Sequence, residues 1–176
     1  MKRIFASLAA VGFVFVLPGT VAGTAAASSL PKTESVIAIF EGHQLRLAES
    51  WGEATACISD QDEARCYRTG GELRKAEGLD ELSLGILAAC GTNLVLFSGT
   101  AYSGSQLYLS ARGQFIGLSA YGFDNITSSY QVGACSARFY EGGGGSTQYP
   151  GSTSAGTWSS TMVSGWDNRI STVYIL

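Results

Sequence analysis

The pattern of apolar and polar residues divides the chain into three stretches. An apolar run from Ile4 to Leu17 follows two basic residues and precedes small residues ahead of Ser28. Residues 36–89 combine short alternating segments, typical of half-buried strands, with one segment that carries helix signals. From Cys90 onward Gly, Ser, Thr, Tyr and Phe dominate, and turn residues recur at intervals of about 8–12 positions. This last pattern predicts an antiparallel sandwich of short strands.

The first stretch predicts a secretory signal. The apolar run is shorter than the roughly 20 residues that a membrane-spanning helix needs, and its basic start and small-residue end are typical of an exported protein. We therefore expect residues 1–27 to be a signal peptide, cleaved near Ala27 or, alternatively, at Gly23. Residues 28–35 are polar and predict a flexible lead-in, and the mature protein is expected to be secreted.

The second stretch, residues 36–89, predicts a small α+β subdomain. Two strands are expected around the Glu41–Gly42 turn, and two more around the acidic turn between Cys57 and Cys66. The run Thr69–Glu72 has the spacing of a capping box, which predicts a helix that ends at Gly78.

The four cysteines of the chain predict two disulfides, because an even count in an oxidising compartment indicates paired cysteines. Three pairings are possible, and we favour Cys57–Cys66 with Cys90–Cys135. Each disulfide should add roughly 2–4 kcal/mol to stability. No CxxC spacing occurs and His43 is the only histidine, so these residues do not predict a zinc site.

The net charge and the single histidine reduce the range of functions that the sequence favours. Loss of Lys2 and Arg3 with the signal changes the formal net charge from −3 to −5. An acidic chain without a basic cluster favours neither nucleic acid nor an anionic membrane as partner. His43 lies in a turn with no nucleophile signature nearby, so we expect no catalytic residues and no enzyme.

An internal repeat is the strongest architectural signal in the third stretch. Phe97–Gly104 opens the first unit with two aromatics and a glycine, and the loop Asp124–Ser129 closes it. Tyr140–Gly151 opens the second unit, which is lengthened by the glycines 142–145, and the loop Asp167–Thr172 closes it. The glycine insertion predicts a mobile hairpin tip. Both loops offer only oxygen donors, which suit a hard cation such as calcium.

These two units resemble the βγ-crystallin family, in particular its microbial calcium-binding members. The loop Asp124–Ser129 matches the family motif Asp/Asn-Asp/Asn-x-x-Ser/Thr-Ser at every position, and the loop Asp167–Thr172 differs only in its final Thr. The resemblance covers residues 90–176. It implies an all-β fold in which two Greek-key motifs form a sandwich, here preceded by the α+β subdomain.

The resemblance also implies two calcium sites between the loops. In each loop the Asp and Asn side chains, the carbonyl of the next residue and the Ser hydroxyl would bind the ion. Further oxygens would come from the hairpins around Ser98–Gly99 and Glu141–Gly142, the latter looser because of the glycine insertion. The expected ligands are Asp124, Asn125, Ile126, Ser128, Asp167, Asn168, Arg169 and Ser171. Alternatively, the same side chains lock the turns without an ion.

Three functions follow from the resemblance. The first is a secreted, non-enzymatic, monomeric calcium-binding protein, stabilised by the ions and the disulfides. The second is a secreted protease inhibitor, because small actinobacterial metalloproteinase inhibitors look similar, and the hairpin 57–66 would enter the enzyme cleft. The third is an antimicrobial, killer-toxin-like protein with a cell-surface target.

The aromatic residues of the chain are expected to build the core rather than a carbohydrate platform. Trp158 is the least core-like of them, because Ser and Thr flank it. The set expected in the core is Trp51, Phe97, Tyr102, Phe115, Phe123, Trp158 and Trp166.

Overall fold

The computed structural model describes residues 34–60, 63–79 and 93–176. Contacts separate Met1–Lys32 from a compact unit that spans Thr33–Leu176, and the description below concerns that unit. The predicted signal peptide (1–27) and all but the end of the lead-in (28–35) lie outside the described residues. In the part of the chain that is described, no helix is long and apolar enough to cross a membrane.

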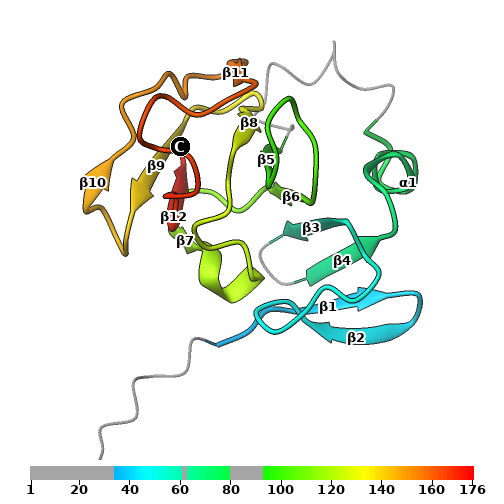
Figure 1. Cartoon of the computed structure of the whole chain (residues 1–176). Helices are drawn as coiled ribbons and strands as arrows, with labels where there is room; N and C mark the ends of the chain where they lie inside the picture. Colours follow the sequence, from blue (N-terminus) through cyan, green and yellow to red (C-terminus); the bar gives the residue numbers. More distant parts are fainter. Residues whose placement is uncertain (1–33, 61–62, 80–92) are drawn as a thin grey trace, which may run out of the picture. The chain divides into compact units, whose positions relative to one another are not determined.

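The described residues form two β-sheets (Figure 1). The larger sheet has the strand order β11-β8-β5-β6-β3-β4-β1-β2, and the smaller sheet has the order β10-β9-β12-β7. The strands of the larger sheet are β1 (Ile37–Phe40), β2 (His43–Arg46), β3 (Ala56–Asp60), β4 (Glu63–Tyr67), β5 (Leu94–Phe97), β6 (Gln106–Leu109), β8 (Ser129–Gln131) and β11 (Trp158–Ser159). The smaller sheet contains β7 (Phe115–Gly117), β9 (Ala137–Glu141), β10 (Thr147–Gln148) and β12 (Thr172–Ile175).

The two repeats of the sequence each supply four strands and exchange their third strands. In the first repeat β5, β6 and β8 pair in the larger sheet, whereas β7 pairs with β12 of the second repeat. In return, β11 of the second repeat pairs with β8 of the first. This pairing confirms the predicted fold class, an all-β sandwich of two Greek-key motifs.

The segment before the repeats extends the larger sheet. Strand β3 pairs antiparallel with β4 and parallel with β6, and β1 joins β4 in parallel. Cys57 lies opposite Cys66 in the β3–β4 hairpin, and the predicted disulfide between them is confirmed. Cys135 is also disulfide-bonded, and its predicted partner Cys90 lies outside the described residues. The boundary expected between residues 89 and 90 likewise lies outside them.

The helix α1 (Gly70–Ala76) begins and ends as the sequence predicts. The hydroxyl of Thr69 accepts a hydrogen bond from the backbone N–H of Glu72 at 3.1 Å, which caps the first turn. Gly78 follows the helix with a φ of +68°. The helix packs on one face of the larger sheet, where Leu73 is fully buried against residues of β3, β5 and β6.

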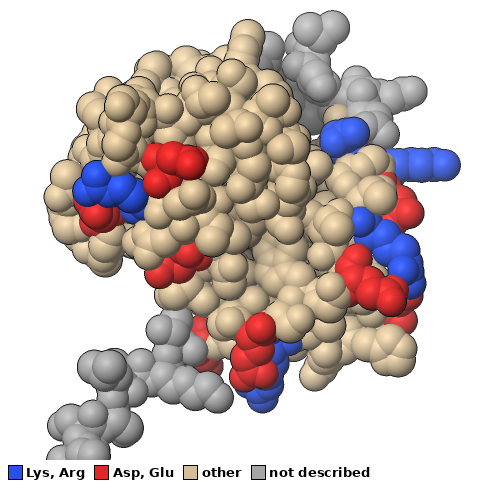
Figure 2. Space-filling model, viewed as in Figure 1, with Lys and Arg blue, Asp and Glu red and all other residues tan. Residues whose placement is uncertain are grey.

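The main core lies between the two sheets, and aromatic rings occupy its centre. The ring of Tyr130 contacts the rings of Phe139 and Tyr149 at centroid distances of 5.0 and 5.8 Å, both edge to face. Every residue of β5 is buried, because the inter-sheet core covers one side of this strand and the α1 cluster covers the other. Charged side chains gather over β1–β4 and α1 on the face in Figure 2, while few lie over the second repeat.

Two aromatic residues depart from the predicted core. Phe97, Phe123 and Trp166 are buried as expected, but the side chain of Trp158 is 71% exposed and that of Phe115 is 50% exposed. Both lie on edge strands, β11 and β7. Their placement in the core was a wrong prediction, because an outward side chain on an edge strand has a neighbouring strand on one side only.

Candidate functional site

The structure brings the two oxygen-rich loops together. The backbone N–H of Asn125 donates to the carbonyl of Ile170 at 3.0 Å, and the N–H of Asn168 donates to the carbonyl of Thr127 at 3.1 Å. Equivalent residues of the two repeats therefore exchange equivalent hydrogen bonds. The loops are related by an approximate twofold symmetry at the junction of the two motifs.

The side chains repeat this exchange. The hydroxyl of Ser171 donates to the Oδ1 atom of Asn125 at 3.0 Å, and the hydroxyl of Ser128 donates to the Oδ1 atom of Asn168 at 3.3 Å. Each asparagine thus meets the serine of the other loop. We define the first cluster as Asp124, Asn125 and Ser171, and the second cluster as Asp167, Asn168 and Ser128.

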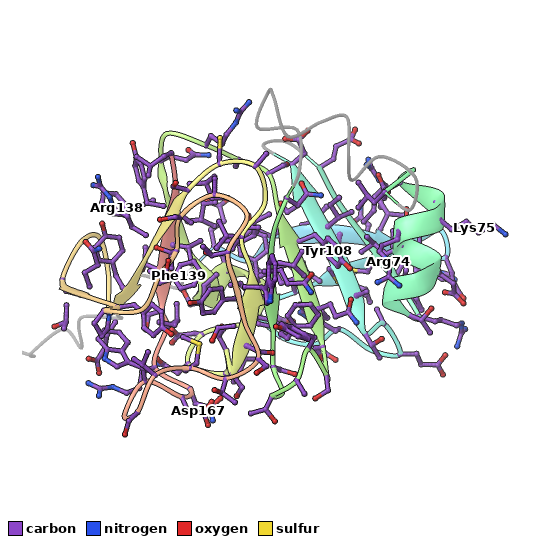
Figure 3. All side chains as sticks on the ribbon, turned by 90° about the horizontal axis from the view of Figure 1, so that it is seen from above. Arg74, Lys75, Tyr108, Arg138, Phe139 and Asp167 are labelled. Atoms are coloured by element: carbon purple, nitrogen blue, oxygen red, sulfur yellow. A yellow bond between two sulfur atoms is a disulfide. The ribbon has the colours of Figure 1, made fainter. Side chains whose placement is uncertain are left out.

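Both asparagines have a backbone conformation that most residues avoid. Asn125 has a φ of +56° and Asn168 a φ of +58°, a left-handed region in which asparagine is among the best-tolerated residues after glycine. Each asparagine also donates its Nδ2–H to the carboxylate of the preceding aspartate, at 3.1 and 3.2 Å. Asp124 and Asp167 remain exposed, and Asp167 lies at the periphery of the molecule in Figure 3. The asparagines therefore shape the turns while the carboxylates face solvent.

The opening hairpins of both repeats fold onto these loops in the same way. The hydroxyl of Ser129 donates to the carbonyl of Gly99 at 2.6 Å, and the hydroxyl of Thr172 donates to the carbonyl of Gly142 at 2.7 Å. Gly142 thus occupies the position equivalent to Gly99 despite the glycine insertion that follows it. Thr172, the one departure from the family motif, makes the same bond as its serine counterpart.

The residue after each asparagine makes the two clusters unequal. In the second loop Arg169 donates to both carboxylate oxygens of Glu141, at 3.0 and 2.5 Å, and lies 5.3 Å from the Trp166 ring centroid. The hydrogen bonds that Arg169 donates to Glu141 raise the pKa of Arg169. The equivalent residue of the first loop is the exposed Ile126. The second cluster therefore has a guanidinium group beside it, and the first does not.

The donor set fits a weakly held calcium ion. Calcium takes oxygen ligands at about 2.3–2.6 Å, so two neighbouring ligands lie about 3–3.5 Å apart. The Ser–Asn oxygen pairs, at 3.0 and 3.3 Å, have this spacing. Among the described residues no three His, Cys, Asp or Glu side chains gather in a way that could hold a metal. With one carboxylate in each cluster, most ligands would be amide, hydroxyl and carbonyl oxygens, which favours low affinity.

One buried hydroxyl of the first loop was not predicted from the sequence. The Thr127 side chain is fully buried, and its Oγ1 atom has no hydrogen-bond partner among the described residues. Its counterpart in the second loop, Ile170, is equally buried and entirely apolar. Only the alignment of the two repeats could have pointed to it, as a polar residue in an apolar position.

Comparison with known proteins gives matches in structure alone. No protein-family model matches the sequence, and no curated protein is significantly similar to it. A βγ-crystallin from Ciona intestinalis aligns with a TM-score of 0.40 and 20% identity, over 48% of this chain and 99% of that one. The N-terminal domain of protein S aligns with a TM-score of 0.40 and 22% identity, over 48% of this chain and 96% of that one.

The class of protein follows from the strand pairing and the loops of this chain itself. Two four-stranded motifs exchange their third strands, and their closing loops face each other. These features define a βγ-crystallin-like fold whose larger sheet is extended by the strands β1 to β4.

Proposed function

We propose that this is a secreted, non-enzymatic protein that binds calcium at the junction of its two motifs, one ion at each cluster. The observation that carries the proposal is the reciprocal contact between Ser171 and Asn125 and between Ser128 and Asn168. Each contact places oxygen donors from both motifs within reach of a single cation. An ion at either cluster would therefore connect the two halves of the domain.

Calcium would stabilise the fold because it binds loops that exist only in the folded state. Extracellular modules bind calcium with dissociation constants of about 10⁻⁴–10⁻³ M. At millimolar calcium, each ion would then add about 0.4–1.4 kcal/mol to the free energy of unfolding. The protein would be most durable in a calcium-rich medium outside the cell.

Calorimetric titration with calcium tests this function. The wild-type protein should bind two ions and melt at a higher temperature in millimolar calcium than in excess chelator. Asp124→Ala and Asp167→Ala should each weaken mainly one binding event. Glu72→Gln, a control that removes the charge of an exposed carboxylate on α1, should bind as the wild type does. Equal heats for the wild type and both loop variants would contradict the proposal.

Inhibition of a secreted metalloprotease is a second candidate, favoured by the confirmed Cys57–Cys66 disulfide. This disulfide joins the paired strands β3 and β4, and residues 61–62 between them lie outside the described residues. Strands β3 and β4 are both embedded in the larger sheet, so neither offers an enzyme a free edge. Assays against a thermolysin-type protease test this function, and an absence of inhibition at tens of micromolar protein would exclude it.

A further inference from the structure

The segment that leads into the first loop is held by a residue from outside the repeats. Trp51 lies between β2 and β3, and its indole Nε1–H donates to the carbonyl of Tyr121 at 2.7 Å. The same indole packs on the ring of Phe123 with centroids 5.6 Å apart. Phe123 immediately precedes Asp124. The side chain of Trp51 therefore contacts two of the three residues that immediately precede Asp124 in the chain.

The second loop obtains the equivalent support from its own repeat. Trp166, the counterpart of Phe123, packs edge to face on Tyr149 at 5.4 Å. Tyr102, which corresponds to Tyr149 in the first repeat, packs instead on Phe97 and belongs to the cluster under α1. Among the described residues of the first repeat, no ring packs on Phe123 as Tyr149 packs on Trp166, and Trp51 supplies this contact.

Further contacts attach the same segment to the N-terminal strands. The backbone N–H of Val36 donates to the carbonyl of Ala120 at 2.9 Å. The hydroxyl of Ser59 and the phenol of Tyr121 are hydrogen-bonded at 3.2 Å. Ala120 and Tyr121 belong to η1, the 3-10 helix at Leu118–Tyr121 that precedes the loop. The N-terminal extension therefore contacts the entrance of the first loop at several points.

We propose that Trp51 is a positioning residue for the first loop, so that the N-terminal extension sets the conformation of Asp124 and Asn125 before any cation binds. This role of Trp51 rests on the proposed calcium function only where it is tested by calcium titration, and amide hydrogen exchange tests it without calcium. Fixing the loop entrance reduces the conformational freedom that cation binding would otherwise have to remove. The first cluster thereby depends on a part of the chain that a two-motif domain alone does not contain.

Amide hydrogen exchange in the calcium-free protein tests the positioning role directly. The reporters are two equivalent amides, Phe123 N–H, which donates to Leu118, and Trp166 N–H, which donates to Val163, both at 3.0 Å. Trp51→Ala should accelerate exchange at Phe123 about tenfold more than at Trp166, because only the first entrance loses its support. Trp51→Phe, which keeps a ring but loses the indole donor, should give a smaller effect in the same direction. Trp158→Ala, which removes an exposed indole, should change neither amide.

Calcium titration of the same variants is the second test. Trp51→Ala should weaken one of the two binding events about tenfold and the other by about twofold or less, as expected when the competent loop becomes a minor population. If the wild-type protein binds no calcium, the proposed function is refuted. Amide hydrogen exchange alone then decides whether Trp51 positions the first loop. Equal acceleration at Phe123 and Trp166, or equal weakening of both binding events, would show general destabilisation and overturn the inference.

Discussion

The carbonyl oxygen of Leu47 occupies the space in which a side chain on Gly122 would begin. A Cβ atom on Gly122 would lie 2.3 Å from this oxygen, far inside van der Waals contact. Gly122 also has a φ of +65° as it ends η1. Contact and backbone conformation therefore both require glycine at this position.

Gly165 provides a matched comparison, since it is the equivalent residue of the second repeat. Its φ is +79°, yet a Cβ atom on it would have no neighbour within 4 Å. Gly165→Ala should cost about 1–2 kcal/mol, the usual penalty for a left-handed alanine. Gly122→Ala should cost at least about 2 kcal/mol more, because backbone must also move. Urea unfolding of both variants measures the difference, and equal losses would show that Leu47 does not constrain Gly122.

Thr127→Val should stabilise the protein. The substitution keeps the shape of the side chain and removes a buried hydroxyl without a described partner, which is worth about 1 kcal/mol. Thr172→Val is the matched control, since it removes a hydroxyl that donates to Gly142, and it should destabilise by about 1 kcal/mol. Thermal and urea unfolding give both values. A loss of stability in Thr127→Val would mean that its hydroxyl has a partner.

Arg169→Ile should strengthen cation binding at the second cluster. The substitution copies Ile126 of the first loop, removes a guanidinium and leaves the carboxylate of Glu141 without its partner. The affinity should rise by a few-fold to about tenfold, and more at low salt, because exposed charges are screened. Ile126→Arg should have the opposite effect on the first cluster. Calorimetry at two salt concentrations measures the calcium affinity of both variants. An unchanged affinity of the second cluster in Arg169→Ile would contradict this prediction.

Acid should weaken the contact between the helix end and the β3–β4 hairpin. Glu77 accepts hydrogen bonds from Arg65 at 2.8 Å and from the Tyr67 hydroxyl, and the Arg65 bonds chiefly lower the pKa of Glu77. Since the folded pKa lies below the unfolded one, this contribution is present above about pH 4.5 and is lost as the pH falls through the folded pKa.

Glu77→Gln tests this contribution. At pH 7 the variant should lose about 1.5 kcal/mol, the lower end of the range for hydrogen bonds to a charged group, because the amide of Gln still accepts a hydrogen bond. The difference from the wild type should shrink as the pH falls from about 4.5 through the lowered pKa of Glu77. Urea unfolding across this range measures the difference, with Glu34→Gln as a control that should follow the wild type. A loss that does not depend on pH would show that the charge of Glu77 is unimportant.

Local chemistry explains which features could be predicted from the sequence. The capping threonine Thr69, the Cys57–Cys66 hairpin and the two closing loops each depend on a few neighbouring residues, and short-range patterns report such residues well. Hydrophobic alternation predicted short strands and the repeat predicted two units, whereas the Greek-key arrangement of the strands followed from the resemblance to the βγ-crystallin family.

Features that depend on contacts between residues far apart in the sequence could not be predicted from such patterns. No local pattern indicates that β3 joins β6 in parallel, or that Trp51 packs on Phe123. The grouping of each asparagine with the serine of the opposite loop also needs the relative position of the two motifs. The Ser and Thr that flank Trp158 made it the least core-like aromatic, but they do not reveal that β11 is an edge strand on which the indole is exposed.

The exchange of β7 and β11 makes each motif depend on the other for a complete sheet. If the chain were divided between the motifs, the larger sheet would lose β11 and the smaller sheet would lose β7. Each loss would expose part of the core to solvent. Neither fragment should accumulate as a native-like intermediate, so the two motifs are expected to melt in one all-or-none step. A tandem duplication thus behaves as a single cooperative unit.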